Sequence, residues 1–217
     1  MPVSSFVHAA LSAAAVGLLL VTLRSAGPRA GGLAAAVPIN SIPALFWLSL
    51  EHGGGYATSA VVGSLWGTGL TVLLGTSFAR LTLAVQAAMP RRHESDPHRG
   101  TTRRTGTALS MAAAGAMSLV VTELSRHSGP QLCGLVAAVP IVGLFALRAG
   151  YRQGGAPLML LVLGGYLDGM AAKAAFLAAL ALAWAVGAGA WAWPIALAAA
   201  ALALRVKHVR ARAHAAA

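Results

Sequence analysis

The sequence has few charged residues and fewer acidic ones. Of 217 residues, 10 % are Asp, Glu, Lys or Arg, and only five are acidic, whereas soluble domains carry roughly 25 % charged residues. Hydrophobic residues make up 58 %, and the mean hydropathy is +0.73. So few charges cannot cover a surface that faces water, which excludes a soluble globular domain. We therefore predict a membrane protein whose surface is largely covered by lipid.

Cysteine and the common catalytic motifs are also scarce. A single cysteine, Cys133, excludes an intramolecular disulfide framework and a Cys-rich metal site. There is no nucleophile elbow, phosphate loop or dinucleotide fingerprint, so we predict neither an enzyme nor a cofactor. His93, Glu94, Asp96 and His98 match no strong metal motif, and we expect a solvated loop there and no bound metal.

Long apolar runs dominate the rest of the sequence. They are ~17 to 25 residues long and do not alternate in polarity, which is typical of helices that cross ~30 Å of hydrocarbon and not of β-barrel strands. We predict an all-α polytopic membrane helix bundle of about seven transmembrane helices. No Lys or Arg precedes the first run, so we interpret it as a permanent span and not a signal peptide. The predicted spans are 6–23, 33–50, 56–79, 107–124, 134–149, 157–180 and 185–204, with 79–89 either extending the third or lying at the interface.

The basic residues, which give a net charge of +11, test this topology. Seven crossings place fourteen of them on one side, leave Arg126 alone on the other, and leave Lys173 inside a span. By the positive-inside rule the N-terminus is outside and the C-terminus cytoplasmic, and the cytoplasmic charges face anionic lipid headgroups and not nucleic acid. An arginine-rich, lysine-poor basic set is typical of a GC-rich bacterial genome, and the predicted location is the bacterial inner (plasma) membrane. The fourteen are Arg24, Arg29, Arg80, Arg91, Arg92, Arg99, Arg103, Arg104, Arg148, Arg152, Arg205, Lys207, Arg210 and Arg212.

An internal repeat divides the chain. "GPRAGGLAAAVPI", 27–39, and "GPQLCGLVAAVPI", 129–141, align without gaps at an offset of 102, with nine of thirteen positions identical. Three spans separate equivalent points, so the two copies face opposite sides of the membrane, an arrangement found in many secondary transporters. The predicted organisation is two inverted three-helix repeats plus one extra helix. Its parts are a first repeat at 1–89, a basic cytoplasmic loop at 90–106, an inverted second repeat at 107–180, and the extra helix with a basic tail at 181–217.

Pro38 and Pro140 occupy matching positions in the two repeats. Proline removes an N–H and clashes with the carbonyl four residues earlier, and in lipid the freed carbonyls need a donor or a cavity. The first copy adds Asn40, Ser41 and Pro43. Asn40 and Ser41 either supply that donor or face a substrate, and the prolines either only kink the helices or form part of a site.

Asp168 and Lys173 lie inside the sixth predicted span. An ionisable residue at the centre of a span costs ~2.5 to 3.5 kcal/mol and by default indicates function. The two are five residues apart, about 140° around a helix. Alternatively, they compensate each other's charge or have partners elsewhere, and serve only packing. Their counterparts in the first repeat are Trp66 and Thr71, so a site built on them would be asymmetric.

Small residues and acidic residues mark two further features of the spans. Gly63, Gly67, Gly165 and Gly169 recur at intervals of four and permit close helix packing, either between these spans at the repeat interface or in a homodimer. Glu51 and Glu123 end two spans on the predicted outer side. They form an acidic vestibule that attracts cations, or they simply solvate helix ends.

The segment "AGGLAAAVPINSIPALF", 30–46, resembles the GlpM-like group of small bacterial membrane proteins, whose chains are about half as long. The resemblance implies a fused pair of such units in a bacterial membrane. It implies no substrate, and it transfers no functional residue to this chain.

Together these features predict a small secondary transporter or permease that moves a small solute or ion across the bacterial inner membrane. Its midplane site would lie at the broken helices. Asp168 would couple transport to a proton or cation, Lys173 would be its counter-charge or contact an anionic substrate, and Asn40 and Ser41 would offer hydrogen bonds. The alternative is a non-transporting accessory or scaffold subunit of an envelope complex. The short chain favours a homodimer.

Overall fold

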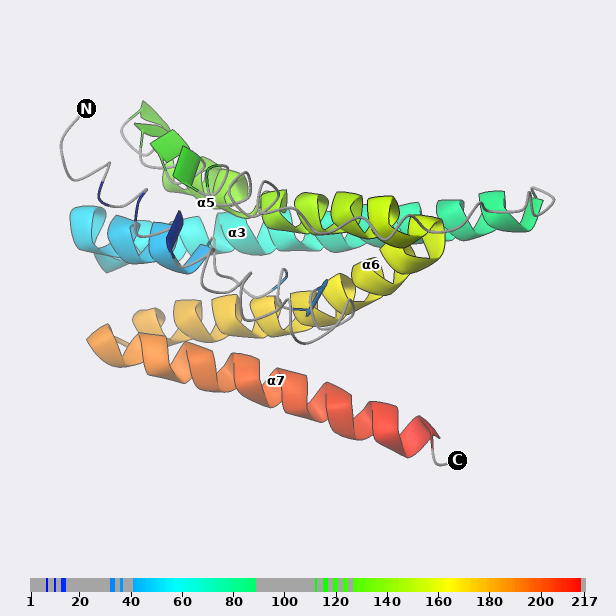
Figure 1. Cartoon of the computed structure of the whole chain (residues 1–217). Helices are drawn as coiled ribbons and strands as arrows, with labels where there is room; N and C mark the ends of the chain where they lie inside the picture. The colour runs from blue at the N-terminus through cyan, green and yellow to red at the C-terminus, as the bar shows by residue number, and fades with distance from the viewer. Residues whose placement is uncertain are drawn as a thin grey trace.

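The computed structural model describes residues 41–88 and 127–215 continuously, together with scattered positions at 7–36 and 112–124. In this part of the chain every regular element is a helix and there is no strand, which confirms the all-α prediction. The elements are α3 (Ser41–Ala88), α5 (Pro130–Ala137), α6 (Ile141–Ala185), the short 3-10 helix η1 (Gly189–Trp191) and α7 (Ala192–Ala215). Figure 1 shows the long helices lying side by side along one axis.

Three helical stretches are long and apolar enough to cross a membrane, namely Ala44–Ala88, Ala146–Ala185 and Gly189–Val206. Large apolar side chains point outward along them, and Trp66 is 75 % exposed. A water-soluble monomer rarely exposes apolar patches on this scale, so the fold supports the membrane-protein prediction. The described residues form four α-helices and not seven. The predicted first span, 6–23, and the predicted fourth span, 107–124, fall mostly outside the described residues.

α3 and α6 are each divided by glycines. Gly53 has φ 82° and ψ 172°, and Gly155 has φ 63° and ψ −157°, conformations that are essentially restricted to glycine. We call residues 41–52 and 54–88 the first and second halves of α3, and residues 141–153 and 156–185 the first and second halves of α6. The breaks coincide with the gaps predicted between spans at 51–55 and 150–156.

The helix bounds decide one detail of the predicted spans and correct another. Residues 79–89 were predicted either to extend the third span or to lie at the interface, and α3 continues without interruption to Ala88. The span predicted at 134–149 is two helices, because α5 ends at Ala137 and α6 begins after Pro140. The turn between them has its own bonds, with the Val139 N–H donating to the Val136 carbonyl at 3.1 Å.

The connection from α6 to α7 is a glycine turn. Gly187 and Gly189 have positive φ, and the Ala188 N–H donates to the Ala183 carbonyl at 2.9 Å. This hydrogen bond is typical of an α-helix that ends at a glycine in the left-handed conformation, where the chain reverses sharply. α7 therefore runs back along the second half of α6, as Figure 1 shows, and Ala192 and Ala196 enter the core.

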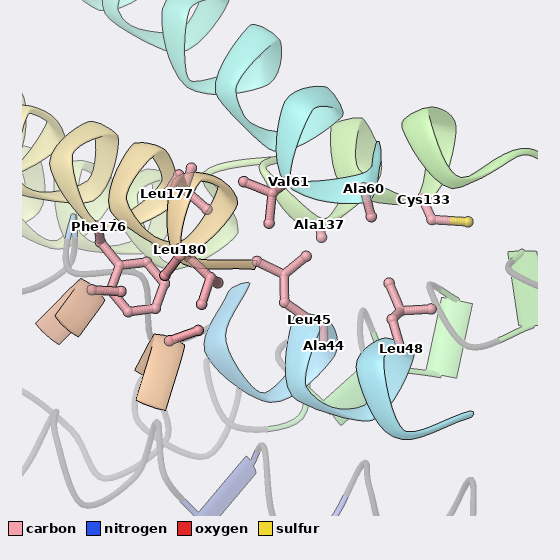
Figure 2. Packing of buried hydrophobic residues seen from close by; sticks show 13 residues of the cluster. Ala44, Leu45, Leu48, Ala60, Val61, Cys133, Ala137, Phe176, Leu177 and Leu180 are labelled. Atoms are coloured by element: carbon pink, nitrogen blue, oxygen red, sulfur yellow. The ribbon is translucent and has the colours of Figure 1, made fainter. Parts of the chain in front are cut away.

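The buried core consists of two clusters, both built on the second half of α6. The larger one joins both halves of α3, α5, α6 and α7, and Figure 2 shows its side chains converging between these helices. The smaller one is formed by Ala36, Leu163, Tyr166 and Met170. Along α6 the smaller cluster ends at Met170 and the larger begins at Phe176, which leaves one stretch of helix between them.

Candidate functional site

Apart from the phenol of Tyr166, four polar side chains are buried among the described residues, and three of them are hydroxyls bonded to backbone carbonyls. Ser64 Oγ donates to the Gly134 carbonyl and Thr68 Oγ1 to the Ser64 carbonyl, each at 2.8 Å. Ser41 Oγ donates to the Ala137 carbonyl at 3.4 Å. These hydroxyls are therefore satisfied inside the protein. The fourth buried polar residue is Lys173.

Ser41 lies at the proline break of the other repeat. In an uninterrupted helix the Ala137 carbonyl would accept a hydrogen bond from the N–H four residues later, but Pro140 ends α5 before that bond can form. The Ser41 hydroxyl supplies a donor instead. Of the two alternatives for Ser41, the structure therefore shows it facing a freed carbonyl. Pro38 and Asn40 are outside the described residues.

Lys173 is 6 % exposed, and it makes no hydrogen bond or ion pair with any residue that the structure describes. Residues three and four positions apart share a helix face, so Lys173 shares its face with Gly169 and Met170 before it and with Phe176 and Leu177 after it. It thus occupies the stretch between the two core clusters.

The neighbours of Lys173 on this face contact the first repeat on both sides. Gly169 packs directly against Leu33 and Ala36. One turn beyond Lys173, Phe176 lies in the same cluster as Leu45 of α3. On the same face of α6, Lys173 therefore lies between a residue that contacts Ala36 and one that packs with Leu45.

Asp168 and Lys173 do not form an ion pair. Asp168 is half-buried, makes an interaction of its own, and lies about 140° around the helix from Lys173. The helix geometry therefore argues against the alternative that these two residues neutralise each other, and a partner elsewhere stays a prediction for Asp168. The counterparts of Asp168 and Lys173 in the first repeat are the uncharged residues Trp66 and Thr71. Thr71 Oγ1 donates to the Gly67 carbonyl at 2.8 Å, and Trp66 faces outward.

The glycine faces of α3 and α6 receive short helical segments from the opposite repeat. Gly63 and Gly67 pack against α5, where a Cβ at Gly67 would lie 2.6 Å from the Ala138 Cβ. Gly169 packs against Leu33 and Ala36, and Gly165 is buried. We predicted that these glycine faces meet each other or a second copy. Instead, the lack of side chains lets a third segment approach each face closely.

The contacts made by the two repeats are reciprocal. A Cβ on Gly134 would overlap the Ala60 carbonyl and approach the Ser64 nitrogen, whereas a Cβ on Gly32 would overlap the Val162 carbonyl and approach the Tyr166 nitrogen. Likewise Gly67 meets Leu135 and Ala138, and Gly169 meets Leu33 and Ala36. In each pair of contacts, every residue number in one contact differs from its equivalent in the other by 102, which is the offset of the sequence repeat. Gly32 and Gly134 were not among the predicted packing glycines, although they occupy equivalent positions in the alignment of the two repeats.

Both predicted outer residues, Glu51 and Glu123, are among the described residues. Glu51 is exposed and next to the α3 break, and Glu123 is half-buried. Across the break the rings of His52 and Tyr56 stack with centroids 4.5 Å apart. Tyr56 Oη donates to the Ser128 carbonyl at 3.2 Å, which ties the α3 break to the segment that follows Glu123. The described residues contain no group of three or more potential metal ligands.

No protein-family model, curated protein or solved structure matches this chain. The resemblance to the GlpM-like group stays a prediction, and no residue role is taken from it.

Proposed function

We propose that the protein is a small secondary transporter built from two inverted halves, with its site around Lys173. The observation that carries this proposal is a buried lysine with no partner among the described residues, on a face of α6 that contacts Ala36 on one side and packs with Leu45 on the other. Ionisable groups inside membrane proteins commonly mark substrate or ion pathways. The proposed solute is small and crosses the bacterial inner membrane.

The reciprocal contacts support the inverted repeat. Suppose that a segment A in one half contacts a segment B in the other half. If the copy of A in the second half contacts the copy of B in the first half, a two-fold rotation relates the halves. The glycine contacts follow this rule at a constant offset of 102. The second halves of α3 and α6 also run in opposite directions in Figure 1, as an axis in the membrane plane requires.

The two glycine breaks support the predicted number of crossings. The first half of α3, the second half of α3 and the second half of α6 each correspond to a separate predicted span. α5 and the first half of α6 together correspond to a fourth span. With α7 and the predicted spans 6–23 and 107–124, the proposed total is seven. In Figure 1 the α6 break and the C-terminal ends of α3 and α7 lie at the same end. Those are the segments that carry the basic residues, so this end is the proposed cytoplasmic one.

In the proposed mechanism the two halves exchange inward-facing and outward-facing shapes around the site. Two copies of one structure that face opposite sides differ little in energy when they swap conformations. Asp168 is the proposed coupling carboxylate, and Lys173 contacts the solute. Ser41 has a structural role, because its hydroxyl holds the second proline break, while Asn40 is proposed to contact the solute.

The test is flux in proteoliposomes. Vesicles that contain the protein are incubated with a small-molecule extract of bacterial cells, and solutes that accumulate relative to empty vesicles are identified by mass spectrometry. We expect accumulation that the Asp168→Asn and Lys173→Ala variants lose, while Thr71→Ala, at the counterpart of Lys173, retains it. No accumulation, with a stoichiometric partner recovered in mild detergent, would favour an accessory subunit instead. Flux unchanged in both variants would refute the assigned site.

A further inference from the structure

We infer that the transported solute is an anion, held by the Lys173 ammonium group once per chain. This inference rests on the proposed function and specifies the class of its substrate. It follows from what surrounds the lysine, what the sequence offers as a counter-ion, and how the two repeats differ at this position.

A buried ammonium group needs acceptors. Removing an ion from water without a partner is among the most costly events in folding, and buried charges are normally paired. In this fold the three buried hydroxyls all reach backbone carbonyls. Among Ser41, Ser64, Thr68 and Lys173, only Lys173 has no partner in the part of the chain that the structure describes. The fold therefore buries this lysine, and no described residue supplies an anion to it.

No carboxylate in the described part of the chain pairs with Lys173. The chain contains five acidic residues. Asp168, Glu51 and Glu123 are described, and none of them pairs with Lys173. Glu94 and Asp96 belong by sequence to the polar segment 90–106, among five arginines. An anion from outside the chain is therefore the remaining source of charge compensation.

The repeat makes this a single site and not a symmetric pair. The counterpart of Lys173 is Thr71, whose hydroxyl is satisfied within its own helix by the Gly67 carbonyl at 2.8 Å. The duplicated scaffold therefore offers two equivalent positions, and only one of them carries a charge. We expect one anion per chain.

The ligand chemistry is that of a carboxylate or phosphate oxygen. Lysine presents a compact point charge with three donors and does not demand the planar two-point geometry that arginine selects. A free carboxylate, a free phosphate and a lipid headgroup phosphate all satisfy it. The core clusters on either side are apolar, which favours a small anion or one with an apolar tail.

The sequence allows a direct measurement, because Lys173 and Lys207 are the only lysines. Protein labelled with ¹³C and ¹⁵N lysine and purified in a maltoside detergent should give two side-chain NMR signals. In the Lys207→Arg variant only the Lys173 signal remains. In the Lys173→Met variant only the Lys207 signal remains, and it serves as the control for general ionic effects. The probes are sodium succinate, sodium phosphate and sodium chloride at equal ionic strength, and phosphatidylglycerol added to the micelles.

We expect a saturable shift of the Lys173 signal that fits one ligand per chain, with only a linear change at Lys207. Saturation by succinate or phosphate identifies a free anion as the source, and saturation by phosphatidylglycerol alone identifies a headgroup. A Lys173 signal that follows no probe differently from Lys207 would overturn the inference. The flux assay separates the two proposals. Saturable anion binding without any flux would refute the transporter and keep the anion site. Flux of a neutral solute that the Lys173→Met variant retains would refute the anion site and keep the transporter.

Discussion

Replacing Gly134 with alanine places a methyl group against the backbone of α3. The new Cβ would overlap the Ala60 carbonyl, and the Ser64 nitrogen lies 2.9 Å away. Because both neighbours are backbone atoms, α5 must move away from α3 as a unit. Overpacking of this kind costs about 1–3 kcal/mol, and the displaced Ser64–Gly134 hydrogen bond adds about 1 kcal/mol. The higher helix propensity of alanine returns about 1 kcal/mol.

The net loss is therefore about 1–3 kcal/mol, which in a chain of this size lowers the unfolding temperature by about 2–12 °C. Tryptophan fluorescence during heating in detergent measures it. The reciprocal contact predicts a loss of similar size for Gly32→Ala. Gly69→Ala is the matched control, because nothing lies within 4 Å of a Cβ there and alanine should be neutral or stabilising in the helix. If Gly134→Ala proves as stable as Gly69→Ala, the close approach of α5 to α3 is wrong.

Three further predictions use the same assay. Ser41→Ala removes the donor to the broken end of α5 and should cost about 0.5–1.5 kcal/mol, whereas Ser49→Ala, which loses only a bond within its own turn, should change stability by less; equal effects would argue against the inter-repeat bond. Gly53→Ala forces a side chain into a positive-φ conformation and should cost about 1–3 kcal/mol, while Gly54→Ala should be tolerated, and a tolerated Gly53→Ala would contradict the break. Lys173→Met keeps the aliphatic stem but removes the unpaired charge, so it should raise the unfolding temperature in anion-free buffer; a lower value would mean that the lysine has a stabilising partner.

The breaks were predictable because their signals are local. Glycine is the residue that tolerates φ > 0, so the run at 53–55 and the pair at 154–155 indicate where the chain can turn. Proline lacks an N–H wherever it stands, so Pro140 predicts the end of α5 without knowledge of its neighbours. The partners of these residues were not predictable. Nothing near Ser41 in sequence indicates that its hydroxyl reaches Ala137, because that contact depends on how helices 96 residues apart pack.

The sequence by itself determined the class of this protein, since too few charges and long apolar runs leave a helical membrane protein as the consistent solution. It also indicated the positions of the helix breaks and the offset of the repeat. The tertiary structure decided what the repeated residues contact. Short segments of the opposite repeat pack against the glycine faces, because a backbone can approach a helix this closely only where the helix has no Cβ atoms. The structure also decided that Lys173 and Asp168 stay apart, because five residues of helix turn their side chains to different faces and packing buries only the lysine face completely.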